Sequence, residues 1–338
     1  MPNTNINLGR NSEGRTESSI FKNPLALTVD VVSFFIVFIV SLLLVSNTIC
    51  MKPFERGFFC DDQSLKYPYK DDTISSSLAA VIAIVIFPFV TFFVEPLYAF
   101  TRMRYGNISC KDVMKVALKS LYSLILLYML GIALTQSVVS VMKLWAGRLR
   151  PNFFAWCIPE YNATECDVGG GYITDFVCLN NDTKEVDDVK QSFPSGHSSS
   201  AVYAFTFVAI YLDIRFRQQL QWRLYMRIIG PSVQTFLVGA GIYICLTRVQ
   251  DNKHHPTDVI GGAVIGLAIC LIMIFGWSRD VFLDMGVRTS EEQPLPMQSY
   301  SLQQGNNNGL QNPIMQSNFS VHNAGHDNEV FSVPMPTV

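Results

Sequence analysis

Residues 121–142, LYSLILLYMLGIALTQSVVSVM, decide the fold, because they form a long apolar run without a charged side chain. A helix needs about 20 mostly apolar residues to cross the hydrocarbon core of a bilayer, and exposed strand edges cannot be satisfied in lipid. Five other segments meet or approach this length, so the sequence predicts an all-α integral membrane protein with six transmembrane helices. The predicted spans are Leu25 to Ser46, Ile74 to Val94, Leu121 to Met142, Ser198 to Ile214, Ile228 to Thr247 and Val259 to Trp277.

The overall composition agrees with a membrane protein. Only 15% of the 338 residues are charged, against a usual share of about 25%. Hydrophobic residues make up 49% of the chain, which excludes intrinsic disorder for most of its length. The formal net charge is −2, and a chain without a basic excess is not expected to bind nucleic acid.

The distribution of lysine and arginine indicates the orientation in the membrane, because cytoplasmic loops carry an excess of both. Basic residues gather before the first span, between spans two and three, and between spans four and five, so we expect both termini to be cytosolic. The predicted parts are a cytosolic segment 1–24, a six-helix domain 25–278 and a cytosolic tail 279–338. From about Thr289 the tail is rich in Gln, Asn, Ser and Pro, which predicts disorder.

The loops on the other side of the membrane carry two N-glycosylation sequons, at Asn162 and Asn181. We expect both to be glycosylated, since these loops are predicted to be extracellular or lumenal. Disulfides persist on that side, but the sequence does not indicate which cysteines pair. The candidates are Cys60, Cys157, Cys166 and Cys178, with Cys50 at the end of the first span.

Six spans bring the loop between spans three and four and the loop between spans five and six to the same face of the membrane. These extracytoplasmic loops and the adjoining helix ends carry cations, imidazoles and a carboxylate. Converging positive groups form a site for an anion with several oxygens, and phosphate fits this description best. The residues are Lys143, Arg148, Arg150 and Pro151, then Pro194, Ser195, Gly196 and His197, then Arg248, His254, His255 and Asp258.

The local pattern supports phosphate chemistry at these loops. Ser195 and Gly196 lie where a loop becomes a helix, so free backbone N–H groups would point at an oxyanion, and Gly196 would allow its close approach. The cations after span three would neutralise phosphoryl oxygens. His254 and Asp258 are four residues apart, so the carboxylate is expected to accept a hydrogen bond from one imidazole nitrogen. The other nitrogen would then be unprotonated and nucleophilic.

Three motifs in this order resemble the signature of the type 2 phosphatidic acid phosphatase superfamily. They are Lys143-x6-Arg150-Pro151, Pro194-Ser195-Gly196-His197 and Arg248-x5-His254-x3-Asp258. The first external loop, Pro53 to Lys70, is similar to that of the animal lipid phosphate phosphatases (phospholipid phosphatases) of this superfamily, and the resemblance covers about residues 25–278. One position departs from the family pattern, because Thr247 stands where the third motif usually begins with Ser.

The resemblance implies hydrolysis of lipid phosphomonoesters at the outer membrane surface, without a metal or another cofactor. His254 would attack phosphorus and form a phosphohistidine, Asp258 would orient it, and His197 would act as general acid and then as general base. The implied substrates are phosphatidic acid, lysophosphatidic acid, sphingosine 1-phosphate and ceramide 1-phosphate, and the expected location is the plasma membrane. The phosphate would be held by Lys143, Arg150, Ser195, Gly196 and Arg248.

Each motif has a simpler interpretation when it is taken alone. The cations can anchor helices at lipid headgroups, which is the role we expect for Arg148. The Pro-Ser-Gly segment can be only a turn and helix cap. His254 and His255 can be solvated, or can form a zinc site with Asp251 and Asp258.

Three other functions compete with the lipid phosphatase. One is a catalytically silent relative that binds lipid or a partner protein, and another is a superfamily enzyme that acts on sugar phosphates or transfers a lipid headgroup. The third is a transporter or channel, for which we expect ionisable residues inside the bundle. Only Asp30 comes close to that requirement. The sequence leaves the oligomeric state open, including a homo-oligomer.

Overall fold

The computed structural model describes residues 24–45, 54–106, 109–162, 164–167, 171–218 and 226–277. All of them belong to the first of two compact units, Met1–Glu292, and the second unit is Gln293–Val338. The predicted tail and nearly all of the predicted cytosolic segment 1–24 lie outside the described residues, as does Cys50. The domain boundaries drawn from the sequence therefore stay predictions.

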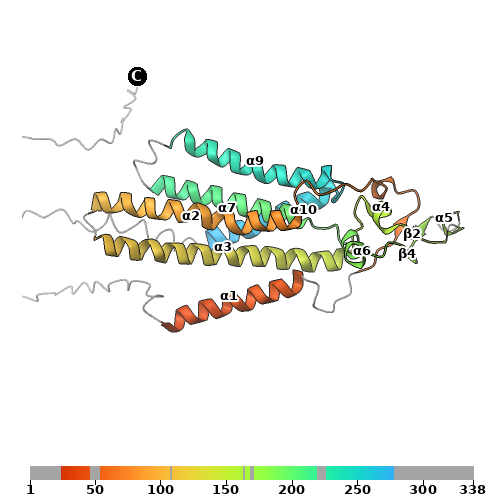
Figure 1. Ribbon diagram of the computed structural model, residues 1–338, viewed down its shortest axis with the longest axis horizontal. Coiled ribbons are helices and arrows are strands. Elements are labelled where there is room, and N and C mark those ends of the chain that lie inside the picture. Colours follow the sequence, from red (N-terminus) through yellow and green to blue (C-terminus); the bar gives the residue numbers. More distant parts are fainter. Residues whose placement is uncertain are drawn as a thin grey trace, which may run out of the picture. The chain divides into compact units, whose positions relative to one another are not determined.

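Each of the six predicted spans coincides with a helix (Figure 1). The helices are α1 (Pro24–Val45), α2 (Ser76–Gly106), α3 (Cys110–Ala146), α7 (Gly196–Gln218), α9 (Ile229–Gln250) and α10 (Pro256–Leu271), which continues into the π-helical turn η2 (Ile272–Trp277). All except α1 are long and apolar enough to cross a bilayer, so the chain is a multi-pass membrane protein. The apolar part of α1, Thr28–Leu44, is shorter. The first predicted span, Leu25 to Ser46, therefore stays a prediction.

Proline lacks a backbone N–H, so a proline within a helix is expected to kink it or mark its end. Pro231 lies in the first turn of α9, where a missing donor costs least. Pro88 does not end its helix, since α2 continues for another 18 residues, from 89 to Gly106.

Helix α7 forms the centre of the bundle and packs against α2, α3, α9 and α10. Of its apolar window, 67% is buried by protein, against 17% for α2. This explains why the corresponding segment is the least hydrophobic of the five spans, since most of it faces protein rather than lipid. Helix α10 approaches α7 closely: a Cβ atom at Gly262 or Gly266 would collide with the α7-side carbonyl oxygens of Ser195 and Ser199.

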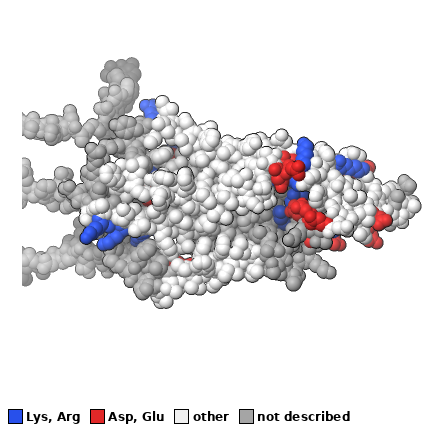
Figure 2. Space-filling model, viewed as in Figure 1, with Lys and Arg blue, Asp and Glu red and all other residues white. Residues whose placement is uncertain are grey.

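The surface agrees with insertion in a bilayer. Figure 2 shows charged side chains at both ends of the face drawn and mostly uncharged atoms between them. Large apolar side chains such as Phe89, Phe92 and Phe93 of α2 point outward and are more than half exposed. Outside a membrane this would be an extended apolar patch, which soluble monomers rarely carry.

One end of the bundle is covered by short elements from the loops. Two disulfides, Cys60–Cys166 and Cys157–Cys178, settle the pairing that the sequence left open. The first of them joins the loop before α2 to the long loop between α3 and α7, and the β1–β3 pair joins the same two loops. The short elements are β1 (Phe58–Phe59), η1 (Gln63–Leu65), α4 (Phe153–Cys157), β2 (Pro159–Glu160), α5 (Thr164–Asp167), β3 (Tyr172–Ile173), β4 (Val177–Cys178) and α6 (Thr183–Val189).

A buried ion pair joins α2 to α7 inside the bundle. Nε of Arg215 donates to Oε1 of Glu95 at 2.7 Å, and both side chains are almost fully buried. The hydroxyl of Tyr211 donates to the same carboxylate oxygen at 2.7 Å, and the guanidinium lies 4.7 Å from the ring centroid of Tyr98. The expectation that only Asp30 approaches the bundle interior is therefore wrong. The pair could not be predicted from the sequence, because Glu95 and Arg215 each directly follow the end of a predicted span.

Candidate active site

Helix ends bring the three predicted motifs together at the end of the bundle that carries the short loop elements. Lys143 lies in the last turn of α3, and Gly147, with a positive φ of 53°, caps the C-terminal end of this helix. His197 lies in the first turn of α7. Arg248 lies in the last turn of α9, and His254 precedes the start of α10. Hydrogen bonds between the loops, described below, show that these elements meet.

The His254 side chain is buried, with 3% of its surface exposed. Its Nδ1 atom lies 2.7 Å from the carbonyl oxygen of Ser192. A carbonyl only accepts, so Nδ1 carries the proton and Nε2 keeps its lone pair. Burial, followed by the positive charges of Arg150 and Lys143, holds the pKa of His254 well below its usual range. The imidazole is therefore neutral at physiological pH, as a nucleophile must be.

The predicted hydrogen bond between Asp258 and His254 is not formed, because Oδ2 lies 3.9 Å from Nδ1. The carboxylate caps its own helix instead: Oδ2 accepts the backbone N–H of His255 at 3.0 Å. The same oxygen accepts the hydroxyl of Ser192 at 2.6 Å. Since the carbonyl of Ser192 holds His254, the carboxylate acts on the imidazole through Ser192.

Arg148 has a different position from the headgroup contact expected for it. Its Nη1 atom donates to Oδ1 of Asp258 at 2.6 Å and to Oγ1 of Thr257 at 2.7 Å. Arg148 also lines a cavity of about 350 Å³ together with His255 and Arg56. Nε2 of His255 lies 3.1 Å from the carbonyl oxygen of Leu149. The His255 ring therefore has a different partner from the His254 ring, which contacts Ser192.

The start of α7 supplies fewer free donors than the sequence predicted. The N–H of Ser195 donates to the carbonyl oxygen of Asp258 at 3.0 Å, and Oγ of Ser195 accepts the hydroxyl of Ser198 at 2.9 Å. The N–H groups of Gly196 and His197, in the first turn, have no partner within the helix. Gly196 is not required by packing, because an added Cβ would make only ordinary contacts at 3.8 Å. Nε2 of His197 is buried without a hydrogen-bond partner among the described residues.

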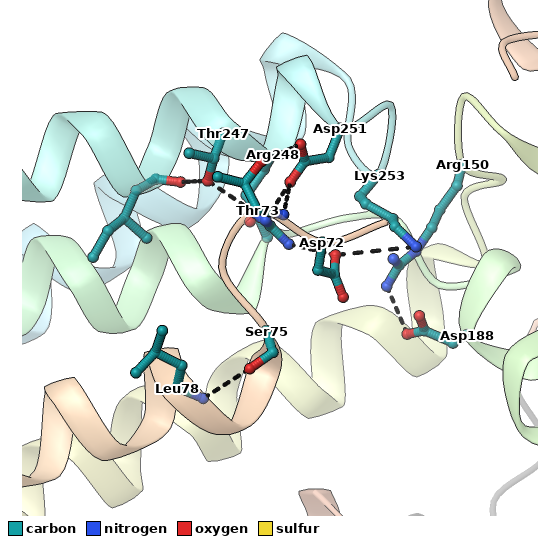
Figure 3. Close-up of polar contacts among 12 residues, drawn as sticks. Asp72, Thr73, Ser75, Leu78, Arg150, Asp188, Thr247, Arg248, Asp251 and Lys253 are labelled. Carbon is teal, nitrogen blue, oxygen red and sulfur yellow. Dashed lines mark hydrogen bonds and ion pairs between the residues drawn. The ribbon is translucent and has the colours of Figure 1, made fainter. Parts of the chain in front are cut away.

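Two of the predicted cations, Arg150 and Arg248, have carboxylates as partners in Figure 3. Nη2 of Arg150 lies 2.6 Å from Oδ1 of Asp188, and its Nε is buried with no partner in the described part of the chain. Arg248 is paired twice, with Asp72 at 2.9 Å and with Asp251 at 2.6 Å.

Thr247, the position that departs from the family pattern, keeps a hydroxyl contact with the neighbouring cation. Its Oγ1 accepts from Nε of Arg248 at 3.4 Å and donates to the carbonyl oxygen of Ile244 at 2.7 Å. A threonine therefore supplies the hydroxyl that serine would supply.

Several residues of the site were not found from the sequence. Lys253 is buried, lies 4.0 Å from Asp72 and stands over the ring of Tyr69 at 4.2 Å. The N–H and hydroxyl of Thr73 both donate to the carboxylate of Asp251. Asp72 and Thr73 come from the loop before α2, far from every motif, so no spacing pattern connects them to the site. Asp251 was named only as a possible zinc ligand. The residues that were missed are Asp72, Thr73, Asp188, Ser192 and Lys253.

The zinc alternative finds no geometric support, since no group of three His, Cys, Asp or Glu side chains among the described residues is arranged to hold a metal ion. His254 and His255 turn to different carbonyl oxygens, of Ser192 and Leu149 respectively.

Comparison with known proteins identifies the family. Residues 124–280 match the family model of the PAP2 superfamily. The chain is 35% identical over 232 residues to phospholipid phosphatase 1 of Mus musculus, which covers 69% of this chain and 78% of that protein. The chain belongs to the PAP2 superfamily. It is also 34% identical over 248 residues to phospholipid phosphatase 2 of Rattus norvegicus, covering 72% of this chain and 85% of that protein.

The membership predicted from the three motifs is thus confirmed for this PAP2 protein. No solved structure matches the chain. The PAP2 match begins in α3 and includes all three motifs, whereas the alignments with the phospholipid phosphatases are longer than the PAP2 match. The chain is therefore a PAP2-family protein that is similar to the phospholipid phosphatases over about 70% of its length.

Proposed function

We propose that this PAP2 protein hydrolyses lipid phosphomonoesters through a phosphohistidine intermediate on His254. The observation that carries the proposal is a buried neutral imidazole whose Nδ1 is held by the carbonyl of Ser192 at 2.7 Å, beside a group of cations. Its Nε2 lone pair is the nucleophile, and the cations would stabilise the charge on the transferring phosphoryl group.

The reaction would proceed in two displacements. In the first, Nε2 of His254 forms a bond to phosphorus while the bond from phosphorus to the lipid oxygen breaks, and protonated His197 gives its proton to the leaving alkoxide. In the second, neutral His197 takes a proton from water, whose oxygen attacks phosphorus and releases inorganic phosphate from His254. The buried Nε2 of His197, without a described partner, suits this proton transfer.

The remaining residues would hold the phosphate or the nucleophile. Asp258 would act as a positioning residue, since it reaches His254 only through Ser192. Arg148 would hold Asp258 at 2.6 Å. These groups supply a nucleophile, an acid and charge stabilisation, so the mechanism needs no metal or cofactor. The groups proposed to bind the phosphate are Lys143, Arg150, Ser195, Gly196 and Arg248.

The proposed substrates are phosphatidic acid, lysophosphatidic acid, sphingosine 1-phosphate and ceramide 1-phosphate. A site at the end of the helices would admit a phosphate headgroup while the acyl chain stays among lipids. We place this end outside the cytosol at the plasma membrane, with both termini cytosolic. The exposed sequon residues Asn162 and Asn181 lie in the loop between α3 and α7 and are the proposed glycosylation sites.

The test is release of inorganic phosphate from detergent-dispersed phosphatidic and lysophosphatidic acid by the purified protein in excess EDTA. We expect release by the wild type and none by His254→Ala. A soluble phosphate ester assayed in parallel separates a lipid phosphatase from an enzyme for sugar phosphates. No release by folded wild-type protein would support the silent relative, and release only after addition of Mg²⁺ would contradict the mechanism.

A further inference from the structure

One carboxylate at the candidate active site has no part in the proposed mechanism. Asp188 lies near the end of the short helix α6, outside the three motifs. Its Oδ1 atom lies 2.6 Å from Nη2 of Arg150. The Asp188 side chain is 43% exposed, whereas the Arg150 side chain is 9% exposed, so the carboxylate reaches the buried cation from the more open side.

Asp188 is surrounded by the groups that are proposed to receive phosphate. The surrounding protein would raise the pKa of Asp188, but the charge of Arg150, followed by those of Lys143 and Lys253, holds the pKa below its usual range. His197 acts on Asp188 in the same direction. A carboxylate and a phosphoryl group both present negative oxygens to a guanidinium, so Asp188 stands where an anionic substrate would bind.

The second arginine of the site is held in another way. Asp251, one partner of Arg248, is buried and also accepts the N–H and the hydroxyl of Thr73, so it is fixed in place. No hydrogen bond to the Asp188 carboxylate other than that of Arg150 is found among the described residues. Figure 3 shows the Asp188 carboxylate pointing at Arg150. The contact of Asp188 with Arg150 is thus more easily exchanged than that of Asp251 with Arg248.

We propose that Asp188 is a counterion of Arg150 that the phosphoryl group displaces. In the free enzyme it holds the guanidinium in place, and during turnover it competes with substrate and product for that cation. This inference rests on the proposed function. A bound phosphoryl group needs the same N–H donors and repels a carboxylate at this distance. Asp188 therefore weakens binding of both substrate and inorganic phosphate, and it favours product release.

The experiment compares Asp188→Asn with Asp187→Asn. Both variants remove one negative charge from α6, but Asp187 is exposed, and among the described residues the ion pair of Arg150 is with Asp188. The Ki of inorganic phosphate, KM and kcat are measured separately for a lipid phosphate in detergent. For Asp188→Asn we expect Ki and KM to fall about tenfold, the order of change that follows from losing one competing hydrogen-bonded charge. We expect kcat not to rise, and Asp187→Asn to match the wild type.

Equal Ki and KM values in the two variants would overturn the proposal. A rise of both in Asp188→Asn would also overturn it, because Asp188 would then position Arg150 for phosphate rather than compete. Thermal unfolding with and without inorganic phosphate tests the same contact without turnover, since bound phosphate stabilises the folded protein. The stabilisation should be larger in Asp188→Asn than in the wild type. If the wild type itself released no phosphate from the lipid, this result would instead contradict the proposed function.

If Asp188→Asn fails to fold, Asp188→Ser removes the same charge and takes its place in both measurements. The expected and the contradicting results are the same for this second variant.

Discussion

Two groups of charged and titratable side chains lie at the two ends of helix α7, and they differ in how their partners are arranged. Arg215 and Glu95 face each other inside the bundle, both almost fully buried, and Tyr211 adds a second donor to the carboxylate. At the start of the same helix, His197 keeps a buried nitrogen without a described partner, and the counterion of Arg150 is a half-exposed carboxylate. From Gly196 to Arg215 is about 28 Å along a helix.

The comparison distinguishes charged groups that stabilise the fold from charged groups that are available to bind a ligand. A buried ion needs its partners, since an isolated charge in an apolar interior costs several kcal/mol or more. The pair of Glu95 and Arg215 meets this need within the protein and is closed to solvent. The outer group leaves donor atoms unused and can exchange a carboxylate for another anion. We therefore expect substitutions in the inner pair to lower stability, and those in the outer group to lower activity.

The largest effect on activity is expected from His254→Ala. Removal of the nucleophile should lower kcat by at least about a thousandfold, because residual rates without the covalent route come only from binding and charge stabilisation. The thermal unfolding temperature should change little, since both described hydrogen bonds of the imidazole ring are to Ser192. Phosphate release and unfolding are both measured in detergent.

The matched control for this variant is His255→Ala, the neighbouring histidine whose ring contacts Leu149 instead. It should keep most of the activity. If both variants were equally inactive, the assignment of His254 as nucleophile would lose its support.

The inner pair is tested by Arg215→Ala, which leaves Glu95 as an uncompensated buried charge. Such a change costs about 3–5 kcal/mol of stability, so the apparent unfolding temperature should drop well below that of the wild type. The folded fraction should keep its kcat/KM, because Arg215 is far from His254.

A double variant, Glu95→Gln with Arg215→Met, removes both charges and should recover a large part of the lost stability. A full loss of kcat/KM in folded Arg215→Ala protein would break the distinction between the two groups.

The sequence predicted the helices and the motif residues because these follow from local patterns. An apolar run of about 20 residues can be recognised within one segment without knowledge of the rest of the chain. The spacing of Arg248, His254 and Asp258 likewise lies within one short stretch. The contacts between segments were not predictable in this way. Asp258 lies on the expected helix face, but its first-turn position makes the backbone N–H of His255 a nearer donor than the imidazole.

The same limit explains the residues that were missed. Asp188 and Asp72 come from loops whose paths depend on the disulfide Cys60–Cys166 and on packing of aromatic side chains around Phe58. Their sequence neighbours, Asp187 and Asp71, are also acidic, so composition gives no reason to select one of each pair. Only the folded loops decide which carboxylate reaches a cation.

A smaller effect is expected from Ser192→Ala, which removes the hydroxyl bound to Asp258 but keeps the backbone carbonyl that holds His254. Loss of one hydrogen bond to a charged group costs about 1.5–3 kcal/mol, part of which should appear in the activation barrier as roughly a tenfold lower kcat. Ser232→Ala on α9, whose exposed hydroxyl donates to Ile228 at 2.9 Å, is the control. An unchanged kcat in Ser192→Ala would separate Asp258 from the nucleophile.

The smallest effect is a pH dependence of stability that belongs to the outer group alone. Because the pKa of His254 is lowered in the folded protein, the unfolded chain binds more protons near and below its ordinary value of about 6.5. Stability from this residue is therefore present above pH 6.5 and is lost as the pH falls toward the folded-state pKa. The unfolding temperature of the wild type should drop between pH 7 and pH 5 by more than that of His254→Ala. Equal drops would mean that His254 is not held neutral by burial and by the cations beside it.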